Sequence, residues 1–124
     1  MTIFYVGDDA ECKKFLARIP LIPINLVVTN REEDIVLQIK RAQPDVIFCD
    51  LSSQRSGGRD LLIRLRTEPE TSLSMIIADL GSVEIVGHGE IKGTDVPGPD
   101  AAVSRPYDFF YIQKIIEAIA ASAQ

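Results

Sequence analysis

Charged side chains follow the apolar runs of this 124-residue sequence in a way that could build a reactive site. The acids are Asp8, Asp9, Asp50 and Asp79, and the base is Arg105. Two carboxylates about 5 Å apart repel by roughly 3 kcal/mol at an effective dielectric of about 20. A divalent cation, a basic side chain or a raised pKa must offset that repulsion. Mg²⁺ binds such carboxylates together with phosphoryl oxygens, and a carboxylate can attack phosphorus as a nucleophile. The alternative is that Asp8, Asp9 and Asp50 only cap helices.

The elements that must position these residues are read from the apolar pattern. Strands are predicted at 2–7, 25–29, 45–49, 74–78 and 101–104. Helical spacing separates them, as in the stripes Cys12/Phe15/Leu16/Ile19, Leu61/Leu62/Leu65 and Ile112/Ile115/Ile116/Ile119. Alternating strands and helices predict a parallel sheet covered on both faces. Its ligand crevice lies outside the carboxyl ends of the strands, where the charged residues fall.

Two stretches carry more specific expectations. Residues 30–33 resemble a capping box, which predicts that a helix carrying Ile35, Ile39 and Ala42 begins there. Segment 80–100 is rich in glycine and proline and has no helical stripe. We interpret four arginines around the third helix as a solvated face, the alternative being a specific site for an anion or a partner; they are Arg55, Arg59, Arg64 and Arg66.

Composition limits the class of protein. The length fits one domain, and we place it at 1–119, with 120–124 as a tail or linker stub. The formal charge of −5 argues against binding to nucleic acid or to an anionic membrane. Cys12 and Cys49 are expected to be free thiols in a reducing cytoplasm. His88 has no metal-ligand partners nearby, so we expect a loop histidine.

The pattern as a whole resembles a response-regulator receiver domain over nearly the whole chain. The matching stretches are Gly7-Asp8-Asp9, Pro44 to Asp50, Gly58 with Leu61 to Arg66, Ser74 to Ile77, and Arg105-Pro106. The resemblance implies a flavodoxin-like three-layer α/β sandwich with strand order 2-1-3-4-5. It makes Asp50 the candidate phosphoacceptor. It also makes Asp8, Asp9, Asp50 and the backbone carbonyl of Ser52 candidate ligands of Mg²⁺.

Departures from the family pattern fall at the switch. Arg105 stands in place of the family's Lys, and the two side chains differ in shape and hydration. Asp79 stands in place of a Thr or Ser, and a carboxylate repels a phosphoryl group instead of donating to it. The position of the family's switch aromatic residue is occupied by Ala102. The hydroxyl missing at Asp79 could come from Ser82 if the loop folds back. The fourth helix is expected to be replaced or weakened by the Gly/Pro-rich segment.

These departures predict a degenerate receiver that signals through protein–protein interaction and is not an enzyme. Asp79 and Arg105 are expected either to pair across the pocket or to be unrelated surface charges. One alternative is a working receiver, phosphorylated on Asp50 by a histidine kinase with Mg²⁺. A remote alternative is a flavodoxin-like enzyme or nucleotide-binding domain. The expected partners are a histidine kinase or another signalling protein, a fused C-terminal output domain, or a second copy in a homodimer.

Overall fold

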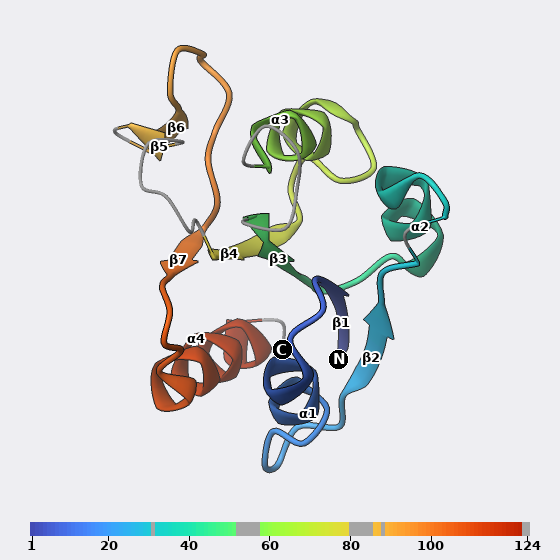
Figure 1. Cartoon of the computed structure of the whole chain (residues 1–124), viewed down its shortest axis with the longest axis vertical. Coiled ribbons are helices and arrows are strands. Elements are labelled where there is room, and N and C mark those ends of the chain that lie inside the picture. The colour runs from blue at the N-terminus through green and yellow to red at the C-terminus, as the bar shows by residue number, and fades with distance from the viewer. Residues whose placement is uncertain (31, 52–57, 80–85, 88, 123–124) are drawn as a thin grey trace.

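A five-stranded parallel sheet forms the centre of the chain in the computed structural model, which describes residues 1–30, 32–51, 58–79, 86–87 and 89–122 (Figure 1). Its strands are β1 (Thr2–Val6), β2 (Asn25–Val28), β3 (Val46–Asp50), β4 (Met75–Asp79) and β7 (Ala101–Val103). They are ordered β2-β1-β3-β4-β7, and every pair is parallel. This confirms the predicted flavodoxin-like α/β fold and its strand order 2-1-3-4-5.

Helices cover both faces of the sheet (Figure 1). One face carries α1 (Ala10–Leu16) and α4 (Phe109–Ser122), and the other carries α2 (Ile35–Ala42) and α3 (Arg59–Thr67). Successive side chains of a strand point to opposite faces. The strands therefore contribute side chains to two separate apolar clusters, one on each face of the sheet. Ile3 and Phe48 belong to one cluster, and Phe4 and Ile47 belong to the other.

The strand ends differ from the prediction by one residue, and the difference matters for the site. β3 and β4 were expected to stop at residues 49 and 78, but Asp50 and Asp79 are the last residues of these strands. The two residues are register partners, Asp50 beside Asp79. Both acids are therefore held by the sheet itself and not by the loops that follow it.

Two helix boundaries were predicted wrongly. Asn30 was expected to cap the second helix, but its side chain accepts a hydrogen bond from the Glu32 backbone N–H and stabilises a turn. The helix begins only at Ile35, where the Asp34 side chain caps it. The first helix ends at Leu16, before Ile19, although Ile19 still packs into the core.

The described part of the segment between β4 and β7 holds a small hairpin. Strands β5 (Val86–Gly87) and β6 (Glu90–Ile91) pair antiparallel, and no helix occurs in the part of this segment that is described, residues 86–87 and 89–100. Ile91 is fully buried on the α3 side of the sheet. The expected loss of the helix is confirmed for these residues, and the segment still contributes to the core.

The last helix continues past the expected domain boundary. α4 ends at Ser122, so residues 120–122 of the predicted tail are helical. The division at residue 119 stays a prediction. Across the described ranges, no helix combines the length and apolar character needed to cross a membrane.

Arg66 is not part of a solvated face, contrary to expectation. Its side chain is only 6% exposed. The guanidinium donates hydrogen bonds to the carbonyls of Ser72, Ser74 and Gly98 and pairs with Asp100 at 2.9 Å. This buried charge is satisfied by carbonyl oxygens and one carboxylate. It ties the end of α3 to the start of β4 and to the approach to β7.

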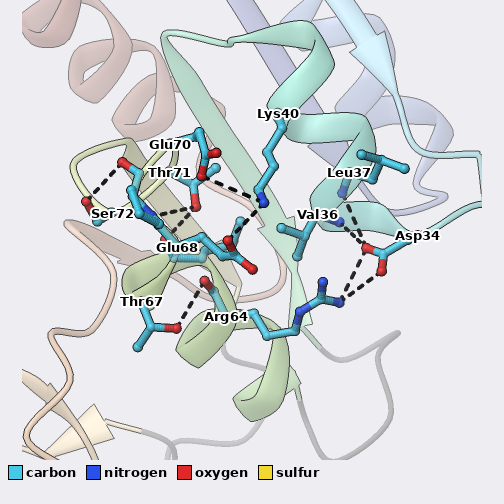
Figure 2. A network of polar contacts seen from close by, with 12 residues as sticks. Asp34, Val36, Leu37, Lys40, Arg64, Thr67, Glu68, Glu70, Thr71 and Ser72 are labelled. Carbon is cyan, nitrogen blue, oxygen red and sulfur yellow. Dashed lines mark hydrogen bonds and ion pairs between the residues drawn. The ribbon is translucent and has the colours of Figure 1, made fainter.

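Polar contacts also join helix α3 and the residues just after it to helix α2 and its capping residue (Figure 2). The Asp34 carboxylate accepts hydrogen bonds from the backbone N–H groups of Val36 and Leu37 and lies 3.2 Å from Arg64 Nη1. Lys40 Nζ lies 2.8 Å from Glu68 Oε2. The cap bond from Leu37, followed by the contact with Arg64, lowers the pKa of Asp34 below its ordinary value.

Replacing this cap should weaken the fold. Asp34→Ala is expected to lower the free energy of unfolding by about 1 kcal/mol, because two helix N–H groups lose their acceptor. The lowered pKa of Asp34 means that its contribution is present above pH 3.8 and is lost as pH falls through the folded-state pKa. Urea unfolding at pH 7 and at pH 3 measures both effects.

Asp34→Asn is the matched control, because it keeps a capping oxygen and removes only the charge. We expect a loss below about 0.5 kcal/mol, since exposed ion pairs contribute little. A cost for Asp34→Asn equal to that for Asp34→Ala would show that the ion pair with Arg64, and not the cap, holds α2.

Candidate functional site

Four charged side chains meet at the carboxyl ends of the parallel strands. We call them the acid–arginine cluster: Asp9, Asp50, Asp79 and Arg105. The Arg105 guanidinium donates from Nε to Asp79 Oδ2 at 2.9 Å and from Nη2 to Asp50 Oδ2 at 2.6 Å. Its Nη1 lies 3.6 Å from Asp9 Oδ2. The predicted pairing of Asp79 with Arg105 is therefore present, and the same guanidinium also reaches the other two acids.

The fold brings these residues together through strand order. Asp50 and Asp79 end neighbouring strands, which lie about 4.8 Å apart in a sheet. Arg105 follows β7, the neighbour of β4 on its other side. Asp9 follows β1, the neighbour of β3, and caps α1. Parallel strands place all their carboxyl ends at one edge, so residues far apart in sequence share one site.

Burial of Asp50 and Asp79 determines how much their pairing with Arg105 contributes to stability. The Asp79 side chain is fully buried and that of Asp50 is 5% exposed, whereas the Arg105 side chain is 46% exposed. A buried carboxylate is costly unless a cation and hydrogen bonds compensate it. The guanidinium gives both acids a charge-assisted bond, and its hydrogen bond to Asp79 is the main reason why the pKa of Arg105 lies above its ordinary value.

Tyr107 extends the cluster, and the sequence interpretation missed it. Its hydroxyl donates to Asp79 Oδ2 at 2.9 Å, and the Arg105 guanidinium lies 5.1 Å from the centre of its ring. Burial, followed by the hydrogen bond to Asp79, raises the pKa of the Tyr107 phenol above its ordinary value. The only signal in the sequence was a hydroxyl two residues beyond Arg105.

Asp9 serves the cluster and the helix at once. Its Oδ1 accepts the Cys12 N–H at 2.9 Å, so the predicted cap is confirmed, while Oδ2 faces Arg105. The Asp9 N–H in turn donates to the Tyr5 hydroxyl at 3.2 Å. Gly7 makes this packing feasible, because a Cβ there would lie 2.7 Å from the Tyr5 oxygen and 3.0 Å from Asp50 Cβ.

The two cysteines are buried free thiols, as predicted. Burial raises the pKa of the Cys12 thiol to about 12, and likewise that of Cys49. Reactive cysteines have a lowered pKa and partial exposure. These thiols therefore act as small apolar side chains near the cluster.

The remaining predicted residues differ in where the structure places them. Asp8 is exposed and takes part in at least one polar or electrostatic interaction. Ala102 is exposed on β7 and lies beside Ala78. Ser52, Ser82 and His88 lie outside the described residues. The roles assigned to Asp8, Asp9, Asp50, Ser52, Asp79 and Arg105 stay predictions.

The acid–arginine cluster does not fit a magnesium ion as it is arranged here. Mg²⁺ requires oxygen ligands directed at one point in near-octahedral geometry. In the cluster, one oxygen each from Asp9, Asp50 and Asp79 is directed at the Arg105 guanidinium. Within the described part of the chain, no group of three or more His, Cys, Asp or Glu residues is arranged to hold a metal ion.

Comparison with known proteins identifies the fold. No protein-family model matches the sequence, and no curated protein does. Among solved structures, the chain is similar to the signal receiver domain of a DNA-binding response regulator from Colwellia psychrerythraea 34H, with 20% identity, a TM-score of 0.73 and 97% and 98% of the two chains covered.

Two further structures agree. A putative response regulator from Chloroflexus aurantiacus gives 22% identity and a TM-score of 0.69, with 97% of each chain covered. The chemotaxis response regulator CheY4 of Vibrio cholerae gives 13% identity and a TM-score of 0.64, with 95% of this chain and 97% of the other covered. The chain therefore has the fold of receiver domains.

Removing the Arg105 guanidinium should destabilise the fold, because the buried acids then lack a cation. Arg105→Met is expected to lower the free energy of unfolding at pH 7 by about 3–5 kcal/mol, because it leaves buried carboxylates without their cation. Urea unfolding at pH 7 measures this loss.

Arg105→Lys is the control, because it keeps the charge but cannot reach three acids as a planar fork. It should lose less stability than Arg105→Met. Equal stability of Arg105→Met and the wild type at pH 7 would show that Arg105 does not compensate the buried acids.

Tyr107→Phe tests the hydroxyl alone. We expect a loss of about 1.5–3 kcal/mol, since the hydroxyl donates to a charged, buried acceptor. The double variant Tyr107→Phe/Asp79→Ala should lose less than the sum of the single losses, because both changes remove the same bond. Urea denaturation of the four proteins completes the cycle, and strict additivity would contradict the bond's contribution.

Proposed function

We propose that this chain is a receiver-like signalling module that acts by protein–protein interaction without phosphorylation of Asp50, and that it is not an enzyme. The observation that carries the proposal is the Arg105 guanidinium, which is bonded to Asp50 and Asp79 and faces Asp9. A basic side chain of the protein itself thus supplies the positive charge that clustered acids require.

The same geometry disfavours phosphoryl transfer to Asp50. Its Oδ2 accepts a 2.6 Å bond from Arg105, and its side chain is 5% exposed. An incoming phosphoryl group would have to displace the guanidinium. It would also approach the carboxylate of Asp79, which repels a group carrying about −1.5 to −2 charges.

The receiver fold supports a signalling role and suggests the kind of partner. One structurally similar domain belongs to a DNA-binding response regulator. We therefore infer that this chain meets a histidine kinase or another signalling protein, or passes its state to a fused output domain. The described part of segment 80–100 and helix α4 are the surfaces that we assign to binding. The two buried free cysteines agree with a cytoplasmic location.

A working receiver is the second candidate, and one observation favours it. The Arg105 side chain is 46% exposed, so its outer part has room to rotate away from Asp50. In that case the chain would switch between two populated states, with Arg105 inward or outward, and a phosphoryl group would favour the second.

Treatment with a small-molecule phosphodonor and Mg²⁺ separates the two candidates. We expect intact-mass spectrometry to show no gain of a phosphoryl group, because Arg105 is bonded to the Asp50 carboxylate and Asp79 repels an incoming phosphoryl group. A gain that Asp50→Asn abolishes would establish the working receiver and overturn our proposal.

A matched variant shows whether the departures from the family pattern are the cause. The triple variant Asp79→Thr, Ala102→Tyr and Arg105→Lys restores the residue types that the family resemblance implies. We expect this variant to accept phosphoryl from the same donor, and the further change Asp50→Asn to remove the gain. A folded triple variant that still takes no phosphoryl group would mean that other parts of the site, and not these three residues, prevent the reaction.

A further inference from the structure

An apolar groove lies at the amino ends of the strands, opposite the carboxyl ends that hold the acid–arginine cluster. It measures about 590 Å³ and runs between the second half of α4 and the starts of the strands. Ile115, Ala118 and Ile119 line it from the helix, and Met75 and Ala101 line it from the sheet. Pockets of about 300–1,000 Å³ accept drug-sized groups, so this groove has room for more than one side chain.

Helix α4 has two apolar faces, which is unusual for a helix on a protein surface. Ile112 and Ile116 are fully buried against the sheet. A second stripe follows the spacing i, i+4, i+7, i+8 from Tyr111 to Ile119 and lines the groove. Tyr111, which lines the groove, is 50% exposed. An exposed aromatic side chain at an apolar groove is typical of protein interfaces.

Two carboxylates are among the polar groups that line the groove. Asp45 and Asp100 line it and stand just before β3 and β7, on either side of the start of β4. Asp100 is paired with Arg66. Asp45 accepts a hydrogen bond from the Thr2 N–H, and no described residue forms an ion pair with it. The Met1 ammonium group is engaged with the Pro23 carbonyl.

We propose that this groove binds an extended or helical segment of a partner protein in which a bulky apolar side chain is followed closely by Lys or Arg. The apolar side chain would lie between α4 and β4, and the cation would meet Asp45. A second copy of this chain is a poorer occupant, because two chains of charge −5 repel. The inference rests on the proposed interaction function and adds the surface and the partner's chemistry.

A selection experiment tests the chemistry directly. A library of random displayed peptides is selected on the immobilised full chain, and the enriched peptides are synthesised and titrated by fluorescence anisotropy. We expect enriched sequences to combine a large apolar residue with Lys or Arg one or two positions away. Backbone amide NMR signals of Ala101, Ile115 and Ile119 should shift during the titration.

Groove variants locate the binding. Ala118→Trp fills the groove from an exposed helix position and should weaken peptide binding by about ten-fold or more, a change of about 1.4 kcal/mol. Ala121→Trp adds the same bulk at an exposed position of α4 outside the groove and should have no effect.

A second pair of variants tests the charge. Asp45→Asn keeps the acceptor for Thr2 and should weaken binding by up to about five-fold, since exposed ion pairs contribute little. Asp95→Asn removes an acidic charge away from the groove and should leave binding unchanged.

Three outcomes would overturn the inference. These are enrichment of no peptide with the stated chemistry, equal peptide binding by Ala118→Trp and the wild type, or self-association that Ala118→Trp abolishes in sedimentation. Failure here leaves the proposed function intact if the chain still takes no phosphoryl group. Conversely, phosphorylation of Asp50 with peptide binding retained would overturn the proposed function alone.

Discussion

The structure depends on one guanidinium held between carboxylates that parallel strands force together. Asp50 and Asp79 are register partners at the ends of central strands, so neither can turn away from the other without leaving the sheet. Burial makes their charges far more costly than at a surface. Arg105 compensates both, and Tyr107 and Asp9 complete its surroundings.

An aromatic path connects this cluster to the helical layer. Tyr107 packs edge-on against Phe48 of β3 and also contacts Phe109 at the start of α4, with ring centres 5.9 Å apart. Phe109 in turn stacks near Phe15 of α1 at 4.7 Å. The position of the Tyr107 ring is set at one end by Asp79 and at the other by these rings. Tyr107 therefore contacts both the acid–arginine cluster and the start of α4.

Sequence patterns predicted the fold well because parallel strands are continuous apolar runs, and β3 is buried along its whole length. The same logic predicted that Asp9, Asp50, Asp79 and Arg105 share one edge. What the patterns could not predict depends on three-dimensional packing. Tyr107 reaches Asp79 only through the turn that follows Arg105, and Arg66 is buried only because carbonyls of distant segments converge on it. The groove exists because of how α4 lies over the sheet, which no periodicity encodes.

The Arg66 anchor has a consequence for how this architecture can diversify. The Asp100 carboxylate accepts from the Ile76 N–H, its own N–H donates to the Ile76 carbonyl, and Arg66 holds both Asp100 and the Gly98 carbonyl. The approach to the final strand is thus anchored to β4 and α3 by hydrogen bonds of its own. Insertions of other lengths can be grafted into the stretch before Gly98, provided that an apolar side chain still fills the place of Ile91 in the core.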